Sequence, residues 1–289
     1  MPGPISFTFT GRRRFMEILV PYLLRERKAS GLAKHVWFVH TANQSDIDYA
    51  HELAAKHPDF FEVMDDNFRP RPSTSDMYYP KIYKHFNTPG QVYIKIDDDI
   101  VFIDKGALGK LANFKLANPQ YFMCLANTIN NGLCSHLHQR FGVLKAKDFF
   151  GWQADNNFYI MYKGGKEPKQ SMWALHECFI AAHQAKNLAQ YKFGPFLLSE
   201  KMVSINCFAV MGDDLLAIRD ALDSVTYPGD TDEGFLSGKA PALLGKQNCF
   251  YGEALVSHYS FVGQKGIFNE RPDLLESYKR ICQEETASA

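Results

Sequence analysis

Three consecutive carboxylates, Asp97, Asp98 and Asp99, are the residues of this sequence best suited to chemistry. They stand between two apolar segments, 92–96 and 100–103, so the chain carries them out of one core strand and into another. An ionised carboxylate is costly to bury without a partner, and a triplet in this position predicts a neutralising cation. Oxygen ligands suit hard divalent ions such as Mg²⁺ or Mn²⁺, which commonly join carboxylates to substrate phosphates. The triplet therefore predicts a metal site for a substrate that carries a diphosphate.

Strand and helix patterns alternate through the segments that precede the triplet. Short apolar runs predict the strands, and apolar residues at helical spacing predict the helices. The expected strands are 5–10, 35–40, 60–64 and 92–96, and the expected helices are 12–28, 45–56 with Ser45 as its N-cap, and 75–86. This order predicts an α/β fold with a Rossmann-like, mainly parallel sheet flanked by helices. Ligands of such sheets bind at the carboxyl ends of the strands, where the triplet lies.

The second half of the chain has a less regular pattern. We expect loops that face an acceptor in the polar stretch 127–170, helices at 172–186, 212–222 and 271–284, and strands at 203–211 and 254–259. No repeat, low-complexity tract or linker divides the sequence. We therefore expect a single domain over residues 1–289.

Composition narrows the class of protein. Lys plus Arg equals Asp plus Glu at 32 each, so no overall charge attracts nucleic acid, and we expect no nucleic-acid partner. The six cysteines contain no C-x-x-C pair, which predicts packed thiols rather than a zinc site or disulfides. No apolar stretch is long enough to span a bilayer, and the N-terminal residues do not resemble a signal peptide. We therefore expect a cytoplasmic enzyme without an integral membrane segment.

The segment 95–102, Lys-Ile-Asp-Asp-Asp-Ile-Val-Phe, resembles the D-x-D region of glycosyltransferases with the GT-A fold. The segment 252–261 is similar to the late strand that supplies a histidine ligand in many of these enzymes. The resemblance implies bound Mn²⁺ or Mg²⁺, with Asp99 as a direct ligand and His258 as a further ligand. It implies that Asp97 binds the metal through water or contacts the ribose.

Simpler structural roles compete with these assignments. The triplet could form a solvated turn between two strands. Asp98 should point to the opposite face of the strand from its neighbours and accept local hydrogen bonds. Without the resemblance, His258 is expected to be a core histidine that is bonded to a backbone carbonyl.

The resemblance implies transfer of a sugar from a nucleoside-diphosphate sugar, with UDP favoured, to a glycan or another hydroxyl acceptor. Residues 1–126 would form the nucleotide-sugar half, and residues 127–289 the acceptor half with the late metal-ligand strand. A divalent ion at the leaving diphosphate would stabilise the charge that develops there in the transition state. Two alternatives are a sugar-phosphate nucleotidyltransferase, for which the segment after the first strand is a poor match, and a non-catalytic nucleotide-sugar-binding relative.

An inverting transferase needs a carboxylate that accepts the proton of the attacking hydroxyl. Asp232 and Glu233 resemble the acidic pair that opens the acceptor-side helix of inverting enzymes, and they are our first assignment. Asp213 and Asp214 follow a predicted strand and are the second. Either pair could instead cap a helix N-terminus. If neither pair supplies the base, a retaining mechanism becomes possible.

Nucleotide contacts are expected near the ends of the first strands and on the helix that precedes the triplet. Glycine permits close backbone approach, and arginine pairs well with phosphate. The assigned residues are Thr8, Thr10, Gly11, Arg12, Asn43 and Lys81, together with Asp97 and Asp98. On the acceptor side, the amide-rich segment 127–132 could bind sugar hydroxyls, and several aromatic residues could stack on a glycan, namely Trp152, Phe158, Tyr159, Tyr162 and Trp173.

Overall fold

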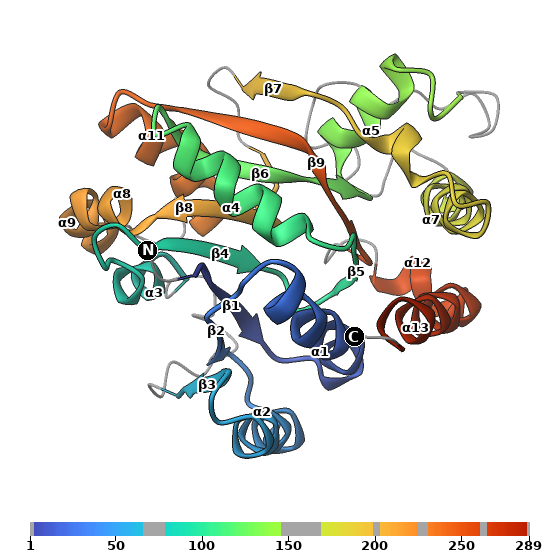
Figure 1. Cartoon of the computed structure of the whole chain (residues 1–289), viewed down its shortest axis with the longest axis horizontal. Coiled ribbons are helices and arrows are strands. Elements are labelled where there is room, and N and C mark those ends of the chain that lie inside the picture. Colours follow the sequence, from blue (N-terminus) through green and yellow to red (C-terminus); the bar gives the residue numbers. More distant parts are fainter. Residues whose placement is uncertain are drawn as a thin grey trace.

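The computed structural model describes residues 3–65, 79–145, 169–198, 203–224, 231–260 and 265–287. Within these residues the chain forms a nine-stranded mixed sheet flanked by helices (Figure 1). The strands are β1 (Ile5–Thr10), β2 (Lys34–Val39), β3 (Phe61–Met64), β4 (Val92–Ile96), β5 (Ile100–Ile103), β6 (Tyr121–Ile129), β7 (Pro195–Leu198), β8 (Cys207–Met211) and β9 (Gln247–His258). The helices are α1 (Arg13–Ala29), α2 (Gln44–Lys56), α3 (Tyr79–Ile82), α4 (Ala107–Ala117), α5 (Gly132–Arg140), α7 (Lys169–Gln184), α8 (Gly212–Ala217), α9 (Arg219–Asp223), α10 (Asp232–Gly234), α11 (Ala240–Leu243), α12 (Lys265–Asn269) and α13 (Pro272–Thr286).

The strand order is β3-β2-β1-β4-β8-β6-β9-β5, and β7 pairs with β9 outside this path. The first four strands are parallel, as the alternation of strands and helices predicts. In the second half, β8 runs antiparallel to β4 and β6, and β5 and β7 run antiparallel to β9. The expected mainly parallel sheet is therefore wrong for this half, because a strand buried on both faces carries no sequence signal of its direction.

Several predicted elements have different limits in the structure. The N-cap of α2 is Asn43, whose side chain accepts a hydrogen bond from the Ser45 amide, so Ser45 is not the cap. The polar stretch expected to form loops from residue 127 begins inside β6 and continues into α5, while its residues 146–168 lie outside the described part. The late strand is longer than expected, because β9 begins at Gln247.

Two apolar cores lie on opposite faces of the sheet. Ile94 and Ile96 of β4 belong to the core that also contains apolar residues of α1, α4, α7 and α13. Tyr93, the residue before Ile94, belongs to the second core, which also contains apolar residues of α3, α8 and α11. The alternation of side chains along a strand thus gives β4 two apolar faces. Lys95 lies on the Tyr93 face, where its contacts with Asp97 and the Ile205 carbonyl help to compensate its burial.

A bulge in β9 bends the sheet toward the end of β4. Ala126 pairs with Tyr251, whereas the next β6 residue, Asn127, pairs with Leu255, so residues 252–254 of β9 are extra in the ladder. Beyond the bulge, β9 pairs with β5, and His258 lies opposite Ile100. A side chain at Gly252 would overlap the Phe193 carbonyl oxygen, which explains why glycine occupies this position.

The short connection between β4 and β5 requires this bend. Residues 97–99 join the two strands, although β8, β6 and β9 lie between them in the ladder. Four Cα steps reach about 15 Å at most, whereas four strand spacings in a flat sheet would need about 19 Å. The sheet therefore curls, and Figure 1 shows β5 next to the carboxyl end of β4. The end of β9 is thereby carried to the aspartate triplet.

Two further expectations concern membranes and cysteines. Among the described helices, none has both the length and the apolar character needed to cross a bilayer. The six cysteines are all free, with five buried and Cys178 partly buried, which confirms the prediction of packed thiols.

Candidate metal centre

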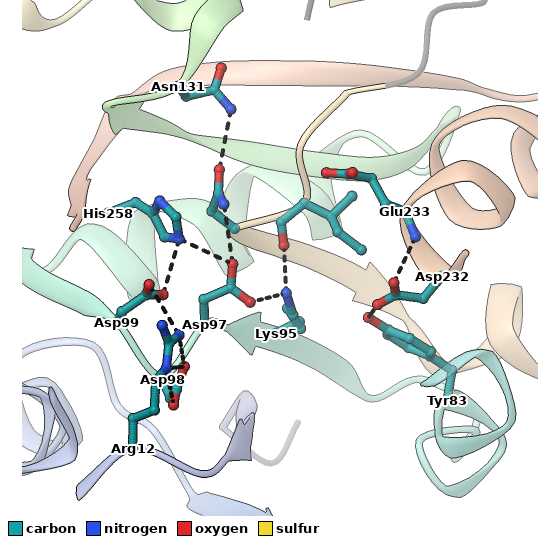
Figure 2. A network of polar contacts seen from close by, with 12 residues as sticks. Arg12, Tyr83, Lys95, Asp97, Asp98, Asp99, Asn131, Asp232, Glu233 and His258 are labelled. Atoms are coloured by element: carbon teal, nitrogen blue, oxygen red, sulfur yellow. Dashed lines mark hydrogen bonds and ion pairs between the residues drawn. The ribbon is translucent and has the colours of Figure 1, made fainter. Parts of the chain in front are cut away.

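Asp97, Asp99 and His258 converge at the carboxyl end of β4 (Figure 2). His258 Nε2 lies 3.0 Å from Asp99 Oδ1 and 3.7 Å from Asp97 Oδ2. Each residue offers one ligand atom, and these atoms all lie within 4.8 Å of one another. These are the three residues that the sequence analysis assigns to a metal, and the structure brings them together from two distant segments.

Backbone hydrogen bonds hold the triplet as a tight turn against β9. The Ile100 amide donates to the Asp97 carbonyl at 3.2 Å, which closes the turn. The Tyr259 amide donates to the Asp99 carbonyl at 2.9 Å, which fixes the end of β9 beside it. The side chains of Asp98 and Asp99 are 9% and 2% exposed, so the solvated-turn interpretation does not describe this segment.

Arg12 pairs with two members of the triplet. Its Nε donates to both Asp98 carboxylate oxygens at 3.1 and 3.0 Å, and its Nη2 contacts Asp98 Oδ1 and lies 3.0 Å from Asp99 Oδ2. Asp98 therefore accepts hydrogen bonds as expected, although its partner comes from the N-terminus of α1 rather than from a neighbouring residue. The Arg12 side chain is 30% exposed, so part of it borders solvent at this site.

Burial and neighbouring groups shift the pKa values of the Asp98 and Asp99 carboxyls in opposite directions. Burial raises the pKa of the Asp99 carboxyl, but its electrostatic interactions with His258 and Arg12 outweigh burial and hold that pKa below its usual range. Burial dominates at Asp98, where it raises the pKa despite the Arg12 ion pair. Asp99 is thus the carboxylate kept ionised, which is the form that binds a metal ion.

Lys95 and Asn206 hold Asp97, and the sequence analysis assigns a role to neither of them. Lys95 Nζ contacts Asp97 Oδ1 and donates to the Ile205 carbonyl at 2.9 Å. Asn206 Nδ2 donates to Asp97 Oδ2 at 3.1 Å, and the Asn206 carbonyl accepts from the Asp97 amide at 2.8 Å. A lysine within an otherwise apolar strand, two positions before a carboxylate triplet, is a signal that points to Lys95. No comparable signal marks Asn206.

Asp232 and Glu233, at the start of α10, lie on the other side of Lys95 from Asp97 (Figure 2). Thr231 caps this helix by accepting from the Gly234 amide at 3.0 Å, and Asp232 Oδ1 accepts from the Glu233 amide at 2.9 Å. The Glu233 carboxylate makes neither of these capping contacts. The simple N-cap role thus belongs to Thr231 and Asp232.

Burial and the charge of Asp232 raise the pKa of Glu233 to about 8, although the positive charge of Lys95 opposes the shift. Burial also raises the pKa of Asp232. The pKa of Lys95 is lowered by its own burial, but the negative charges of Asp97 and Asp232 outweigh that effect and raise it. Lys95 is therefore a fixed positive charge between two acidic groups. Glu233 can exchange a proton near neutral pH, which is the property of a general base.

The alternative acidic pair lies at the opposite end of β4. Met211 of β8 pairs with Val92, so the residues that follow β8 lie near the start of β4. Asp213 Oδ2 accepts from the Gly90 amide at 2.7 Å. Asp214 forms ion pairs with Lys115 at 3.2 Å and Lys246 at 2.6 Å. The antiparallel direction of β8 thus removes this pair from the triplet, and their assignment as the base is wrong for this site.

The predicted nucleotide contacts are only partly brought to the site. Arg12 is adjacent to the triplet, and Gly11 lies before it with little room for a side chain beside Thr41 and the His40 carbonyl. Thr8 and Thr10 are buried in β1, and the Thr10 hydroxyl donates to Met16 Sδ at 2.6 Å, so neither hydroxyl is presented to solvent.

Asn43 and Lys81 lie on other elements. Asn43 is exposed at the start of α2, where its side chain caps the helix. Lys81 of α3 is beside Asp223, whose pKa is lowered mainly by its hydrogen bond from Lys84 and further by the charge of Lys81. Asp223 closes α9, which follows β8 and thus belongs near the start of β4 rather than its carboxyl end. The structure therefore associates Lys81 with α9 and not with the triplet.

The amide-rich segment expected to bind an acceptor is buried. Asn127 Nδ2 donates to the Tyr191 and Gly252 carbonyls at 2.8 and 3.1 Å, and Asn130 Nδ2 donates to the Tyr259 carbonyl at 3.0 Å. Asn131 is 2% exposed and caps α5. These amides bind the protein itself, so the expectation that they contact sugar hydroxyls is wrong. Of the aromatic candidates, Trp173 packs against the core, and the others, Trp152, Phe158, Tyr159 and Tyr162, lie outside the described residues.

The donor set fits a divalent metal ion. Two carboxylate oxygens and one imidazole nitrogen converge with both aspartates anchored by neighbouring groups. Carboxylates suit Mg²⁺ and Mn²⁺, and an imidazole among them favours Mn²⁺ over Mg²⁺. Comparison with protein-family models finds no match to this sequence, and comparison with curated proteins also finds none.

Proposed function

We propose that this protein is a metal-dependent glycosyltransferase of the GT-A type that moves a sugar from a nucleoside-diphosphate sugar to a hydroxyl acceptor. The observation that supports it best is the convergence of Asp97, Asp99 and His258 at the carboxyl end of β4. The same end of the sheet carries Arg12 and the start of α1, and it is where ligands of open α/β sheets bind. UDP is our first choice for the nucleotide.

In this proposal Asp97, Asp99 and His258 hold Mn²⁺ or Mg²⁺. When bound, the ion neutralises charge on the leaving diphosphate. Arg12 supplies a second positive charge at the same place, and its Nη1 can donate to a phosphate oxygen while Asp98 and Asp99 hold Nε and Nη2. Lys95 pairs with Asp97 and stays bound to the Ile205 carbonyl, so it holds Asp97 in place.

Glu233 is our choice for the base of an inverting reaction. Its raised pKa, about 8, lets it accept the proton of the attacking hydroxyl near neutral pH. Lys95 separates it from Asp97, so the base and the proposed leaving-group site are distinct (Figure 2). Asp232 acts on it through charge, because its own carboxylate is engaged by the Glu233 amide.

The test is a panel of nucleoside-diphosphate sugars, incubated with the protein, Mn²⁺ and a mixture of simple glycan acceptors. Acceptor-dependent release of nucleoside diphosphate from at least one donor is the expected result. Release of pyrophosphate from nucleotide and sugar phosphate would instead indicate a nucleotidyltransferase. Metal-dependent binding of nucleotide without turnover of any donor would indicate a non-catalytic relative. Absence of both turnover and Mn²⁺-dependent nucleotide binding would overturn the proposal.

A further inference from the structure

A chain of four hydrogen bonds connects the start of α5 to the carboxylate of Asp97. The Leu133 and Cys134 amides each donate to Asn131 Oδ1 at 3.1 Å, which caps α5. Asn131 Nδ2 donates to Asn206 Oδ1 at 3.2 Å, and Asn206 Nδ2 donates to Asp97 Oδ2 at 3.1 Å (Figure 2). Both asparagines are buried, with 2% and 4% exposure, so water does not compete freely for these bonds.

The helix N-terminus determines the direction of every bond in this chain. Free amides at the start of a helix can only donate, so the Asn131 oxygen must face them. Its nitrogen must then face Asn206, which receives this bond on its own oxygen. Asn206 is consequently left with its nitrogen toward Asp97. An ionised carboxylate can only accept hydrogen bonds, so this orientation suits Asp97 and the reverse orientation would repel it.

We infer that Asn131 and Asn206 form an amide relay that positions the Asp97 carboxylate for metal binding, and that α5 sets the polarity of that relay. The relay holds Oδ2 of Asp97, the oxygen nearest His258, while Lys95 holds Oδ1. Neither asparagine offers a ligand atom to the candidate centre, so both are positioning residues. This inference rests on the metal site of the proposed function.

Substitution Asn131→Asp reverses the polarity of the relay and keeps the helix cap. Aspartate caps helices about as well as asparagine, but it has no donor for Asn206. The Asn206 amide then turns its nitrogen toward residue 131 and its oxygen toward Asp97. We expect the affinity for Mn²⁺, measured by calorimetric titration without nucleotide, to fall by about 10-fold or more, as for other residues that orient metal ligands.

The direction of this effect separates the relay from simple electrostatics. A new negative charge near a cation site tightens cation binding through space, so the relay predicts the opposite sign. Asn131→Ser, which keeps a cap but shortens the side chain so that it no longer reaches Asn206, is the matched control. It should lower the affinity for Mn²⁺ less than Asn131→Asp does. In an Asn206→Ala background, Asn131→Asp should no longer weaken Mn²⁺ binding. Equal or tighter binding by the single Asn131→Asp variant would overturn the relay.

A second measurement does not require metal. In the presence of a chelator, urea denaturation of the wild type, Asn131→Asp, Asn206→Ala and the double variant forms a double-mutant cycle. The relay predicts that Asn131→Asp destabilises the wild type more than it destabilises Asn206→Ala. Additive effects would overturn the relay. If the wild-type protein binds no Mn²⁺, the proposed metal site fails, and this cycle still decides whether Asn131 and Asn206 are coupled as the relay requires.

Discussion

His258 Nε2 and Asp99 Oδ1 lie 3.0 Å apart, although one residue ends β9 and the other lies in the turn between β4 and β5. Two features of the chain produce this contact. The bulge at residues 252–254 bends β9, and the pairing of His258 with Ile100 aligns its end with the triplet. The contact therefore depends on the curvature of the whole sheet. Its role can be tested by substitutions at the contact itself or at the bulge that bends β9.

Asp99→Asn should remove most of the affinity for Mn²⁺. The amide keeps the shape of the carboxylate but loses its charge and its ability to accept at both atoms, so His258 and Arg12 lose their shared partner. We expect a loss of more than about 100-fold in calorimetric titrations, above the range for residues that only orient ligands. Asp104→Asn, which breaks an ion pair with Lys192 at 2.7 Å, is the control. Unchanged Mn²⁺ affinity in Asp99→Asn would rule out the assigned centre.

Glu233→Gln should abolish turnover and spare nucleotide binding. The variant keeps the size of the side chain and removes the group that accepts the proton, which typically lowers the rate by about 10²- to 10⁴-fold. Because Glu233 lies across Lys95 from Asp97, the affinity for UDP with Mn²⁺ should stay within about twofold of the wild type. Asp232→Asn should reduce turnover less, since it changes only the surroundings of the base. Wild-type turnover in both variants would place the base elsewhere.

The stability of the metal-free protein should depend on the protonation of Glu233. The folded state keeps the proton up to a pKa of about 8, whereas the usual value is 4.5, so the folded state binds more protons in this range. The neutral form stabilises the fold fully below pH 4.5, and this contribution is lost as the pH rises through about 8.

Glu233→Gln mimics the neutral form, so its advantage over the wild type should grow between pH 5 and pH 9. The gain should be about 1–2 kcal/mol, less than the full pKa shift implies, because the side chain is only partly buried and water screens it. Urea denaturation with a chelator at several pH values measures it, with Glu62→Gln, on the exposed side of β3, as the control. A pH-independent difference would contradict the raised pKa of Glu233.

Gly252→Ala should damage both the fold and the metal site. The added methyl group overlaps the Phe193 carbonyl oxygen, and relief of this contact must displace β7 or the bulge of β9. We expect a loss of about 1–3 kcal/mol in the free energy of unfolding and a weaker affinity for Mn²⁺ at temperatures where the variant is folded. Gly194→Ala, at a position with open space around the glycine, is the matched control. Equal stability of the two variants would show that the bulge tolerates a side chain.

Local patterns predicted the parallel half of the fold. The strands β1, β2, β3 and β4 follow one another through helices, and their parallel direction agrees with the alternation of elements, whereas the pairing of β4 with β1 was not predicted. The direction of β8 and β9 depends on distant pairing and carries no local signal. Residue 127 illustrates the difficulty, because a polar amide inside a buried strand reads as a loop unless its partners are known.

The candidate centre likewise contains residues that the sequence marks and residues that only the structure reveals. Asp97 and Asp99 are recognisable because three carboxylates after an apolar strand need compensation, and a family resemblance added His258. Asn206 has no such mark, since a single asparagine before a strand has many ordinary roles. Its relationship to Asp97 arises only when β8 is placed antiparallel to β4, so that residues 206 and 97 meet at one end of the pair.

The curled sheet makes residues 97–99 a seam between the parallel strands and the β9–β5 edge. An ion bound by Asp97, Asp99 and His258 would link the turn after β4 to the end of β9 and so connect both sides of that seam. Binding to the folded chain alone raises its stability according to ligand concentration and dissociation constant, by about 2.7 kcal/mol at a hundredfold excess over that constant. Saturation with manganese should therefore raise the melting temperature and slow hydrogen exchange first at β5 and the end of β9, the strands that close the seam.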